Sequence, residues 1–333
     1  MKKYTISVVS KRFDNNTTSG GAVSKAPADI SLLAKKAGCE ELVVFMNYRY
    51  GKLLGYLNVL RQLLMFSFRL KRGDVVMVQY PQICNPIFMP IVHFILRKCR
   101  RVAVIHDMFS LRETGVLSKR EIKALAPFSD IYVHTDNMKQ YLEDKIDGSV
   151  RYHVLGCFPY IVPTVEFRRH QSNQVCFAGN LDKSLFLSDF VRANDKLEIL
   201  LFGSIKDKSV FDGKAHYMGR FSPNDISMLQ GSWGLVWDGD SMETCTGHYG
   251  EYLKLIAPHK FSLYLVARMP IIVWRESAMA KLVMENNLGV VIDSLSQVYE
   301  ILSDVDEAQY QLMLNSINSF VLSNMNNCSK FKF

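Results

Sequence analysis

The stretch "ADISLLAKKAGCEELVVFM" at residues 28–46 decides the fold class of this chain. Its first part places apolar residues at a spacing near 3.6 and ends at Gly38, a pattern that predicts an amphipathic helix with a glycine stop. Its second part, "ELVVFM", is a short apolar run rich in β-branched residues and predicts a buried strand. A helix followed by a strand that is apolar on both faces is typical of a parallel sheet covered by helices.

The same alternation extends over the rest of the chain. In the first half, strand-like runs begin at Tyr4 ("YTISVV"), Asp74 ("DVVMVQY"), Arg101 ("RVAVIHD"), Asp130 ("DIYVHT") and Arg151 ("RYHVLG"). A polar, proline-containing stretch at residues 156–174, which we interpret as a linker, interrupts the pattern. It then restarts with "VCFAGN", "KLEILLFG", "AHYMG", "WGLVWDG", "MPIIVW" and "LGVVID". We therefore predict an α/β protein with two Rossmann-like domains.

Two such domains facing a cleft form the GT-B architecture, which periplasmic-binding-like proteins and some epimerases share. A chain of 333 residues exceeds the usual size of one hydrophobic core, which agrees with two domains. We place the N-terminal domain at residues 1–160 and the C-terminal domain at residues 173–315. The remaining residues, 316–333, form a tail that could return to the N-terminal domain.

Composition excludes several classes of protein. Hydrophobic residues make up 48% and charged residues 22%, as in a globular protein. No run approaches the roughly 20 apolar residues that a membrane-spanning helix needs. The apolar stretch before Lys11 is too short for a signal peptide, so we expect a cytoplasmic protein. Seven scattered cysteines without a C-x-x-C pair argue against a disulfide framework or a zinc ribbon.

Positive charge is concentrated in the first half. Residues 1–160 hold 24 Lys and Arg against 13 Asp and Glu, a net charge of +11, whereas the remainder holds 16 against 19, a net charge of −3. The usual partners of a basic domain are nucleic acid and anionic membrane surfaces. Nucleic acid is not expected, because no recognition motif accompanies the charge. Residues 48–72 form either a helix on a membrane surface or a core-packing helix with a basic outer face.

In the first domain, candidate site residues follow the first and fourth strands, because ligands of open α/β sheets bind at the carboxyl ends of strands. Gly20 and Gly21 would allow the backbone to approach an acceptor closely, although an ordinary flexible loop is the alternative. Asp107 could remove the proton from an attacking hydroxyl, with His106 beside it. Alternatively, Asp107 caps the next helix and His106 holds a loop.

In the second domain, the turn after residue 178 combines Gly179 and Asn180 with Lys183 nearby, which suits a nucleotide diphosphate. Asp238 begins the sequence "DGD", the form of a metal-binding D-x-D motif. Because this motif follows a strand of the second domain, we expect Asp238 to bind sugar or shape the loop. No metal or other cofactor is expected.

A second helix start supplies a stronger diphosphate site. Pro258 precedes a helical apolar pattern, so "HKFS" at residues 259–262 forms the first turn of a helix. Free N–H groups and the positive end of the helix dipole would meet the Lys260 ammonium there. A cation at this position opposes the dipole, and a bound anion would explain it.

The segment "GLVWDGDSMETCTGHYGEYLKLIAPHKFSLYL" at residues 234–265, with the later "MPIIVW", resembles bacterial β-1,6-galactofuranosyltransferases of O-antigen and capsule assembly. The chain is more loosely similar to the accessory glucosyltransferases of serine-rich adhesins. The similarity is strongest from Val175 to Asp293 and continues through residues 105–107. The resemblance implies a GT-B fold, with a UDP-sugar held by the second domain and the acceptor mainly by the first.

The resemblance also assigns residues to the donor. It implies that Gly179, Asn180 and Lys183 form the donor-site turn, that Arg220 and Phe221 lie in a loop near the nucleotide, and that Lys260 lies at the diphosphate. The glutamate–seven residues–glutamate signature of many retaining GT-B enzymes is not evident, which fits an inverting mechanism.

These observations predict transfer of galactofuranose from UDP-galactofuranose to a lipid-linked glycan acceptor, at the inner face of the membrane if the enzyme binds there. A homo-oligomer is compatible with the sequence. The alternatives are a glucosyltransferase acting on a glycoprotein and a non-catalytic sugar-binding protein.

Overall fold

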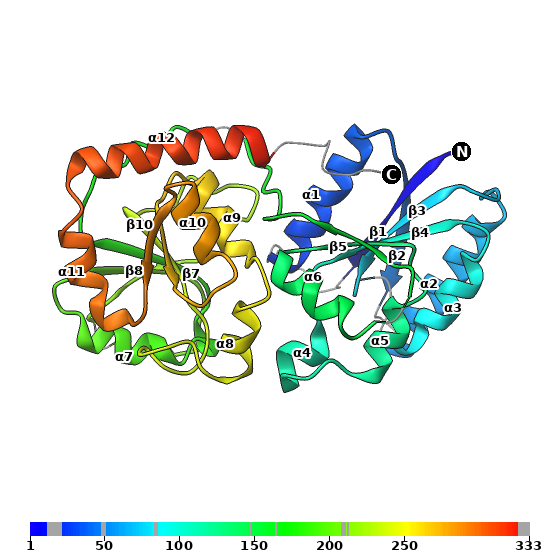
Figure 1. Ribbon diagram of the computed structural model, residues 1–333, viewed down its shortest axis with the longest axis horizontal. Helices are drawn as coiled ribbons and strands as arrows, with labels where there is room; N and C mark the ends of the chain where they lie inside the picture. Colours follow the sequence, from blue (N-terminus) through cyan, green and yellow to red (C-terminus); the bar gives the residue numbers. More distant parts are fainter. Residues whose placement is uncertain are drawn as a thin grey trace. The chain divides into compact units, whose positions relative to one another are not determined.

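The chain folds into two compact α/β units (Figure 1). The computed structural model describes residues 1–11, 22–47, 51–82, 86–146, 148–163, 165–207, 211 and 213–325. The first unit extends to Gly156, and the second begins at Cys157. Each unit contains one six-stranded sheet in which every strand pair is parallel. The predicted α/β fold class is therefore confirmed.

In the first unit the strand order is β2-β1-β3-β4-β5-β6. Its elements are β1 (Lys3–Lys11), α1 (Ala22–Lys36), β2 (Glu40–Asn47), α2 (Lys52–Ser67), β3 (Val75–Tyr80), η1 (Pro86–Phe88), α3 (Met89–Ile95), β4 (Arg100–Ile105), α4 (Phe109–Thr114), α5 (Lys119–Leu125), β5 (Asp130–Val133), α6 (Asp136–Glu143) and β6 (Arg151–Val154).

In the second unit the strand order is β12-β11-β10-β7-β8-β9. Its elements are β7 (Gln174–Asn180), η2 (Leu181–Lys183), α7 (Phe186–Ala193), β8 (Glu198–Ser204), β9 (His216–Gly219), β10 (Trp233–Val236), α8 (Gly247–Leu253), α9 (His259–Val266), β11 (Ile271–Trp274), α10 (Ala280–Glu285), β12 (Gly289–Ile292), η4 (Leu295–Gln297), α11 (Val298–Ser303) and α12 (Glu307–Asn324).

Each sheet has one position at which the strand order reverses direction, between β1 and β3 in the first unit and between β7 and β10 in the second. Helices leave such a point on opposite faces of the sheet, and the crevice outside the carboxyl ends of the two strands is the usual ligand site. The reversal between β7 and β10 follows the strand order of dinucleotide-binding domains. The topology therefore directs attention to two strand pairs.

Tyr264 separates β7 from β10 toward their carboxyl ends. The two strands are paired at Trp233–Val175 and Gly234–Cys176. Two residues further along β7, the Ala178 amide donates a 2.7 Å hydrogen bond to the Tyr264 hydroxyl of α9. Gly234 permits this packing, because a Cβ there would lie 2.3 Å from the Tyr264 ring. The strand pair therefore opens at its carboxyl end.

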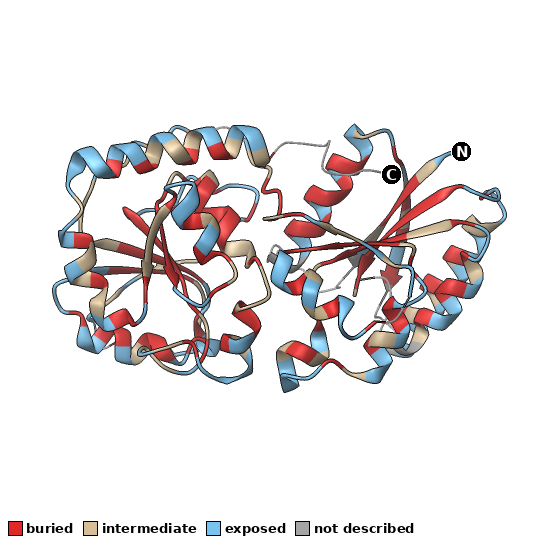
Figure 2. Ribbon diagram, viewed as in Figure 1, coloured by how far each residue is buried: buried red, intermediate tan, exposed pale blue. Residues whose placement is uncertain are grey.

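Two clusters of apolar side chains cover the faces of the second sheet. Figure 2 shows its strands coloured largely as buried. One cluster includes Phe261 and Leu265 of α9 and Phe320 of α12, and the other includes Phe186 and Phe190 of α7. The strands β10 and β11 are buried at every residue, as their unbroken apolar sequences predict. Five cysteines, Cys39, Cys99, Cys157, Cys176 and Cys245, are buried and free, as small core residues.

The predicted linker at residues 156–174 differs from a free connection, because it packs against the second unit. Phe158 is buried, and its carbonyl accepts a 2.7 Å hydrogen bond from Ser262. The Arg169 guanidinium donates to the carbonyls of Leu229, Gly231 and Ala267. These contacts satisfy carbonyl groups that lie outside the sheet ladder, which a polar sequence pattern cannot reveal.

The predicted tail boundary at residue 316 falls inside α12, which runs without interruption to Asn324. Asp306 and Gln309 form a capping box at its start. Ile317 and Phe320 belong to the core of the second unit, so these residues do not form a separate tail. Residues 326–333 lie outside the described residues.

The core-packing part of the prediction for α2 is confirmed, but the outer face of the helix carries large apolar side chains instead of being mainly basic. Val59, Leu60 and Leu63 face the first unit, whereas Leu57 and Phe68 are exposed. In the parts of the chain that the structure describes, no helix is both long enough and apolar enough to cross a bilayer.

We predict that His134 makes the protein sensitive to mild acid. The side chain is fully buried after β5, its Nε2 lies 3.0 Å from the Ile105 carbonyl, and burial lowers its pKa from 6.5 to about 4. The unfolded chain therefore binds a proton below pH 6.5 that the folded chain excludes. Stability is intact above pH 6.5 and should fall by about 3 kcal/mol as the pH drops to 4.

The measurement is the free energy of unfolding in urea at pH 7 and at pH 4.5. His134→Gln should lose less stability over this range than the natural protein, whereas His216→Gln, a change at an exposed histidine, should lose the same amount. An equal loss in all three proteins would contradict the prediction.

Candidate functional site

The carboxyl ends of β7 and β8 form an open backbone platform in the second unit. Gly179 pairs with Gly203 and Asn180 pairs with Ser204, and both Gly179 and Asn180 are exposed. Gly203 has a φ of 143°, and a Cβ there would lie 1.7 Å from the Gly179 carbonyl oxygen. Only glycine fits this close approach. The turn predicted at Gly179 therefore depends on a second glycine that the sequence analysis did not single out.

Lys260 brings a cation to the same edge. Helix α9 begins at His259 with Pro258 as its N-cap, as predicted. The Lys260 ammonium turns inward and donates a 2.6 Å hydrogen bond to the Trp237 carbonyl, the first residue after β10. It also lies 4.6 Å from the centre of the Phe177 ring in β7. The ammonium therefore bridges the two strands at which the sheet order reverses.

The charge of Lys260 is held in a partly buried environment. Burial lowers the pKa of the ammonium, and the nearby charge of Asp238 acts in the opposite direction. Burial raises the pKa of the Cys245 thiol to about 12, so this cysteine is neutral. Asp238 is thus the anionic neighbour of Lys260 in the folded protein. A phosphate group at this edge would add a second anion to the same cation.

The "DGD" sequence forms a compact loop. Asp238 is half-buried, and its carboxylate accepts a 3.1 Å hydrogen bond from the Gly239 amide. Gly239 has a φ of 108°, and a Cβ there would lie 2.5 Å from the Thr246 carbonyl oxygen. At Gly247 a Cβ would lie 2.7 Å from the Asp240 carboxylate. Close packing against backbone therefore requires glycine at Gly239, whereas at Gly247 the positive φ of 72° favours it.

Among the described residues, no group of three or more His, Cys, Asp and Glu side chains is arranged to hold a metal ion. The loop-shaping role expected of Asp238 agrees with its contact to Gly239. That the reaction needs no metal stays a prediction.

The other predicted donor residues differ in their surroundings. Lys183 ends η2 and is exposed. Arg220 is exposed in the loop after β9, where it is accessible to a ligand. Phe221 packs edge to face against Phe202 with ring centres 6.0 Å apart. It also packs against the apolar cluster that includes Phe261 and Leu265 of α9. Phe221 thus anchors the loop that presents Arg220.

In the first unit, Asp107 lies at the carboxyl end of β4, next to the reversal point between β1 and β3. Its carboxylate is half-buried and forms an ion pair with Arg112 of α4. The same guanidinium binds Glu113 at 2.8 Å. The alternative that Asp107 caps a helix is wrong, because Met108 occupies the N-cap of α4. The first amides of that helix, those of Phe109 and Ser110, donate to Glu121 instead.

His106 is held by a buried polar network. Its Nε2 lies 2.8 Å from Gln79 Oε1. The Gln79 amide nitrogen donates to the Ser31 hydroxyl and to the Pro27 carbonyl of α1. With this orientation the Gln79 oxygen accepts a hydrogen bond from His106, so Nε2 is the ring nitrogen that carries the hydrogen. Gln79 therefore holds His106 at the end of β4 through Nε2, and a catalytic role for His106 stays a prediction.

Three further residues of the first unit bear on the acceptor prediction. Lys25, near the start of α1, is buried and forms a 2.7 Å ion pair with Asp29. It therefore does not project toward a ligand as a solvated lysine would. Gly20 and Gly21 lie outside the described residues, so their acceptor-binding role stays a prediction.

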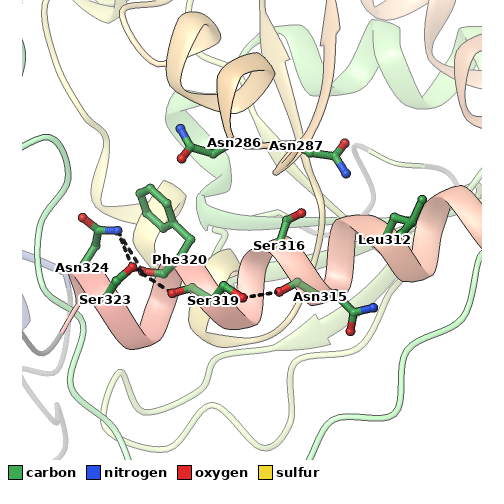
Figure 3. A pocket seen from close by; sticks show the side chains of 9 residues that line it. All are labelled: Asn286, Asn287, Leu312, Asn315, Ser316, Ser319, Phe320, Ser323 and Asn324. Atoms are coloured by element: carbon green, nitrogen blue, oxygen red, sulfur yellow. Dashed lines mark hydrogen bonds between the residues drawn. The ribbon is translucent and has the colours of Figure 1, made fainter.

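A surface hollow lies away from these edges (Figure 3). It has a volume of about 510 Å³ and is formed by α12 and the turn before β12. The turn leads into the amino end of β12, whereas ligands of such sheets bind at carboxyl ends. We therefore do not assign the hollow to the donor. Its lining consists of Asn286, Asn287, Leu312, Asn315, Ser316, Ser319, Phe320, Ser323 and Asn324.

Sequence reasoning missed Gly203, Gln79, Glu121 and Tyr264. The stretch "LLFGS" at residues 200–204 places Gly203 at the end of an apolar strand, the same signal that identified Gly179. Gln79 is the one polar residue inside the otherwise apolar strand "VVMVQY", which could have marked it. Glu121 and Tyr264 act through contacts distant in sequence, and no local pattern identifies them.

Comparison with known proteins assigns the chain to a protein family. A model described as "Glucosyltransferase 3-like, N-terminal domain" matches residues 6–151, and one described as "Glucosyltransferase 3-like, C-terminal domain" matches residues 175–326. The chain is 32% identical over 260 residues to the β-1,6-galactofuranosyltransferase WbbI of Escherichia coli strain K12, covering 74% of this chain and 73% of that protein.

Two further proteins extend the comparison. Glucosyltransferase 3 of Streptococcus gordonii is 26% identical over 311 residues, which cover 89% of this chain and 87% of that protein. Among solved structures, sucrose-phosphate synthase from Thermosynechococcus elongatus has a TM-score of 0.61 at 12% identity, covering 98% of this chain and 95% of that one. This last likeness concerns the fold alone, and it confirms the GT-B architecture.

We predict that Lys260 binds the diphosphate of a nucleotide at the β7–β10 edge. Replacement by methionine keeps most of the apolar stem and removes the charge. Lys260→Met should weaken UDP binding, measured by calorimetry, by about 1.5–3 kcal/mol, the scale of a charge-assisted hydrogen bond. The matched control is Lys281→Met, at a lysine whose side chain is 80% exposed on α10.

The contrary possibility is that Lys260 only fixes the end of β10 through the Trp237 carbonyl. In that case Lys260→Met would lower the melting temperature and leave UDP affinity at the value of the natural protein. Measuring both quantities on the same sample separates the two roles.

Proposed function

The chain belongs to the glucosyltransferase 3-like family and is a glycosyltransferase, and we propose that it transfers galactofuranose from UDP-galactofuranose to a glycan of the cell surface. The observation that supports the donor is the 32% identity to a β-1,6-galactofuranosyltransferase over about three quarters of both chains. The acceptor class we propose is a growing O-antigen or capsule glycan on a lipid carrier.

We assign donor binding to the second unit. The reversal point between β7 and β10 is the place where the strand order favours a nucleotide. Gly179 and Asn180 expose backbone on one side of it, and Lys260 supplies positive charge between the strands. When the sugar leaves UDP, negative charge grows on the β-phosphate. A fixed ammonium and the first turn of α9 would stabilise that charge without reorganising.

We assign acceptor activation to Asp107 in the first unit. In a single displacement at the anomeric carbon, the acceptor oxygen forms the new bond while UDP departs with the electrons of the old one. The acceptor proton must go to a base, and a carboxylate at a strand end can accept it. Arg112 fixes the orientation of that carboxylate, and the Gln79–His106 network fixes the end of β4 that bears it. The outcome would be inversion at the anomeric carbon.

A second candidate is glucosyl transfer to a glycoprotein. The observation in its favour is the similarity to glucosyltransferase 3 of Streptococcus gordonii, which extends over more of the chain at lower identity. The polar groups assigned above would serve either sugar, because they address the diphosphate and the attacking hydroxyl. The two reactions therefore differ in the donor sugar and the acceptor.

The donor proposal predicts a ranking of UDP-sugars. With a crude lipid-linked glycan fraction as acceptor, UDP release should be at least about tenfold faster from UDP-galactofuranose than from UDP-glucose or UDP-galactopyranose, because a site that hydrogen-bonds sugar hydroxyls discriminates strongly. The assay measures UDP by a coupled enzyme. Faster release from UDP-glucose would favour the second candidate, and binding of UDP-sugars without release in any case would indicate a non-catalytic protein.

The base assignment predicts a large kinetic effect with little effect on the donor. Asp107→Asn should lower kcat by about 10²–10⁴-fold, the usual contribution of a general base, while UDP affinity stays nearly constant. Glu113→Gln is the matched control, because Glu113 binds the same Arg112 guanidinium but lies in α4. A stable Asp107→Asn protein with unaltered kcat would remove Asp107 from the mechanism.

A further inference from the structure

Helix α2 has an outer face made of large apolar side chains. Leu53, Leu57, Leu64 and Phe68 recur at intervals of four, seven and four residues, so they lie on one side of the helix. Their exposed fractions are 60%, 47%, 48% and 78%. Leu54 and Met65 flank this row and are exposed by 53% and 59%. A solvent-facing helix side of this kind is normally polar.

The apolar face continues onto α3. Helix α3 packs beside α2, where the rings of Tyr56 and Phe88 lie 5.3 Å apart. On α3, Ile91 and Phe94 are exposed by 45% and 65%. We call the exposed side chains of the two helices the α2–α3 surface: Leu53, Leu54, Leu57, Leu64, Met65, Phe68, Ile91 and Phe94. Eight large exposed apolar side chains on two helices that are in contact indicate an interaction site.

Arginine side chains lie on and beside the α2–α3 surface. Arg61 lies within the α2 row, Arg69 follows Phe68, and the Arg97 guanidinium lies 4.3 Å above the Phe94 ring. Between residues 42 and 106 the sequence contains ten Lys and Arg but a single acidic residue, Asp74. Asp74 is buried, and its carboxylate accepts hydrogen bonds from the amides of Lys2 and Lys71.

We propose that the α2–α3 surface binds an anionic phospholipid bilayer, with α2 lying in the interface. Apolar side chains enter the boundary of the acyl chains while the surrounding arginines contact anionic headgroups, which is the chemistry of interfacial amphipathic helices. A second copy of this chain would bring the same positive charge to the contact. Charge complementarity therefore favours a membrane over self-association.

The proposal is independent of the sugar that is transferred. Vesicle sedimentation of the full chain tests it, with vesicles of phosphatidylcholine alone or with about 30% phosphatidylglycerol. Since each Lys or Arg near an anionic surface strengthens binding about fivefold, the anionic vesicles should bind the natural protein at least tenfold more tightly. Raising NaCl from about 0.1 to 0.5 M should weaken that binding through screening.

The apolar contribution is tested by the triple variant Leu57→Gln, Leu64→Gln and Phe68→Gln, which should reduce binding to anionic vesicles at least tenfold. The matched control changes three exposed leucines of the second unit, Leu185, Leu312 and Leu322, to glutamine and should bind as the natural protein does. Unchanged melting temperature and far-UV circular dichroism in both variants verify that they are folded. This readout also keeps the result separate from the proposed transfer reaction.

Two results would overturn the proposal. One is sedimentation of the natural protein that is equally weak with both kinds of vesicle. The other is equal vesicle binding by the triple variant and the control. If light scattering instead shows a dimer that the triple variant dissociates, without vesicle binding, the α2–α3 surface contacts a second copy of the chain.

Discussion

The structure depends on one constraint, which is that all twelve strands run parallel within sheets covered by helices. A strand buried on both faces favours apolar side chains, as β10 and β11 illustrate. Polar chemistry is therefore displaced to the strand ends, where the chain leaves the sheet. Gly179, Asp238 and Asp107 each occupy such an end, although their sequence neighbours have nothing in common.

The exceptions to this constraint are informative. Gln79 is buried inside β3, and it is tolerated because its amide is satisfied by Ser31, Pro27 and His106 together. Lys260 is a cation at the end of a buried strand pair, satisfied by a carbonyl and an aromatic ring. Each of these side chains joins elements that the strand reversal would otherwise leave apart. In each unit, one of these two polar side chains thus lies beside the reversal point of the sheet.

The sequence predicts the strands and the start of α9 well, because both depend on local patterns. The apolar run before His106 and the proline before His259 need no knowledge of distant residues. The direction of the Lys260 side chain could not be predicted, since it depends on Phe177 and Trp237, which precede it by 83 and 23 residues. The cap of α4 is a similar case, because Glu121 reaches it from the following helix.

Helix α2 shows a different limit of prediction from the sequence. Its apolar spacing is visible in the sequence, but periodicity alone does not say which face of the helix is buried. Val59, Leu60 and Leu63 supply one apolar face and Leu53, Leu57 and Leu64 another, so both sides satisfy the same pattern. The structure resolves this by showing that the amides of Asn58 and Gln62 donate to the Phe45 carbonyl of the edge strand β2. These hydrogen bonds fix the rotation of the helix about its axis.

That rotation has a consequence for the acceptor. The first turn of α2 follows β2, so Leu53 and Leu54 lie toward the carboxyl edge of the first sheet, the edge to which Asp107 belongs. A bilayer in contact with α2 would therefore meet the first unit beside the strand ends assigned to the acceptor. A glycan whose carrier is embedded in lipid must extend only from the membrane to that edge. In this unit, the helix that covers an edge strand and the carboxylate that accepts a proton would thus serve the same substrate.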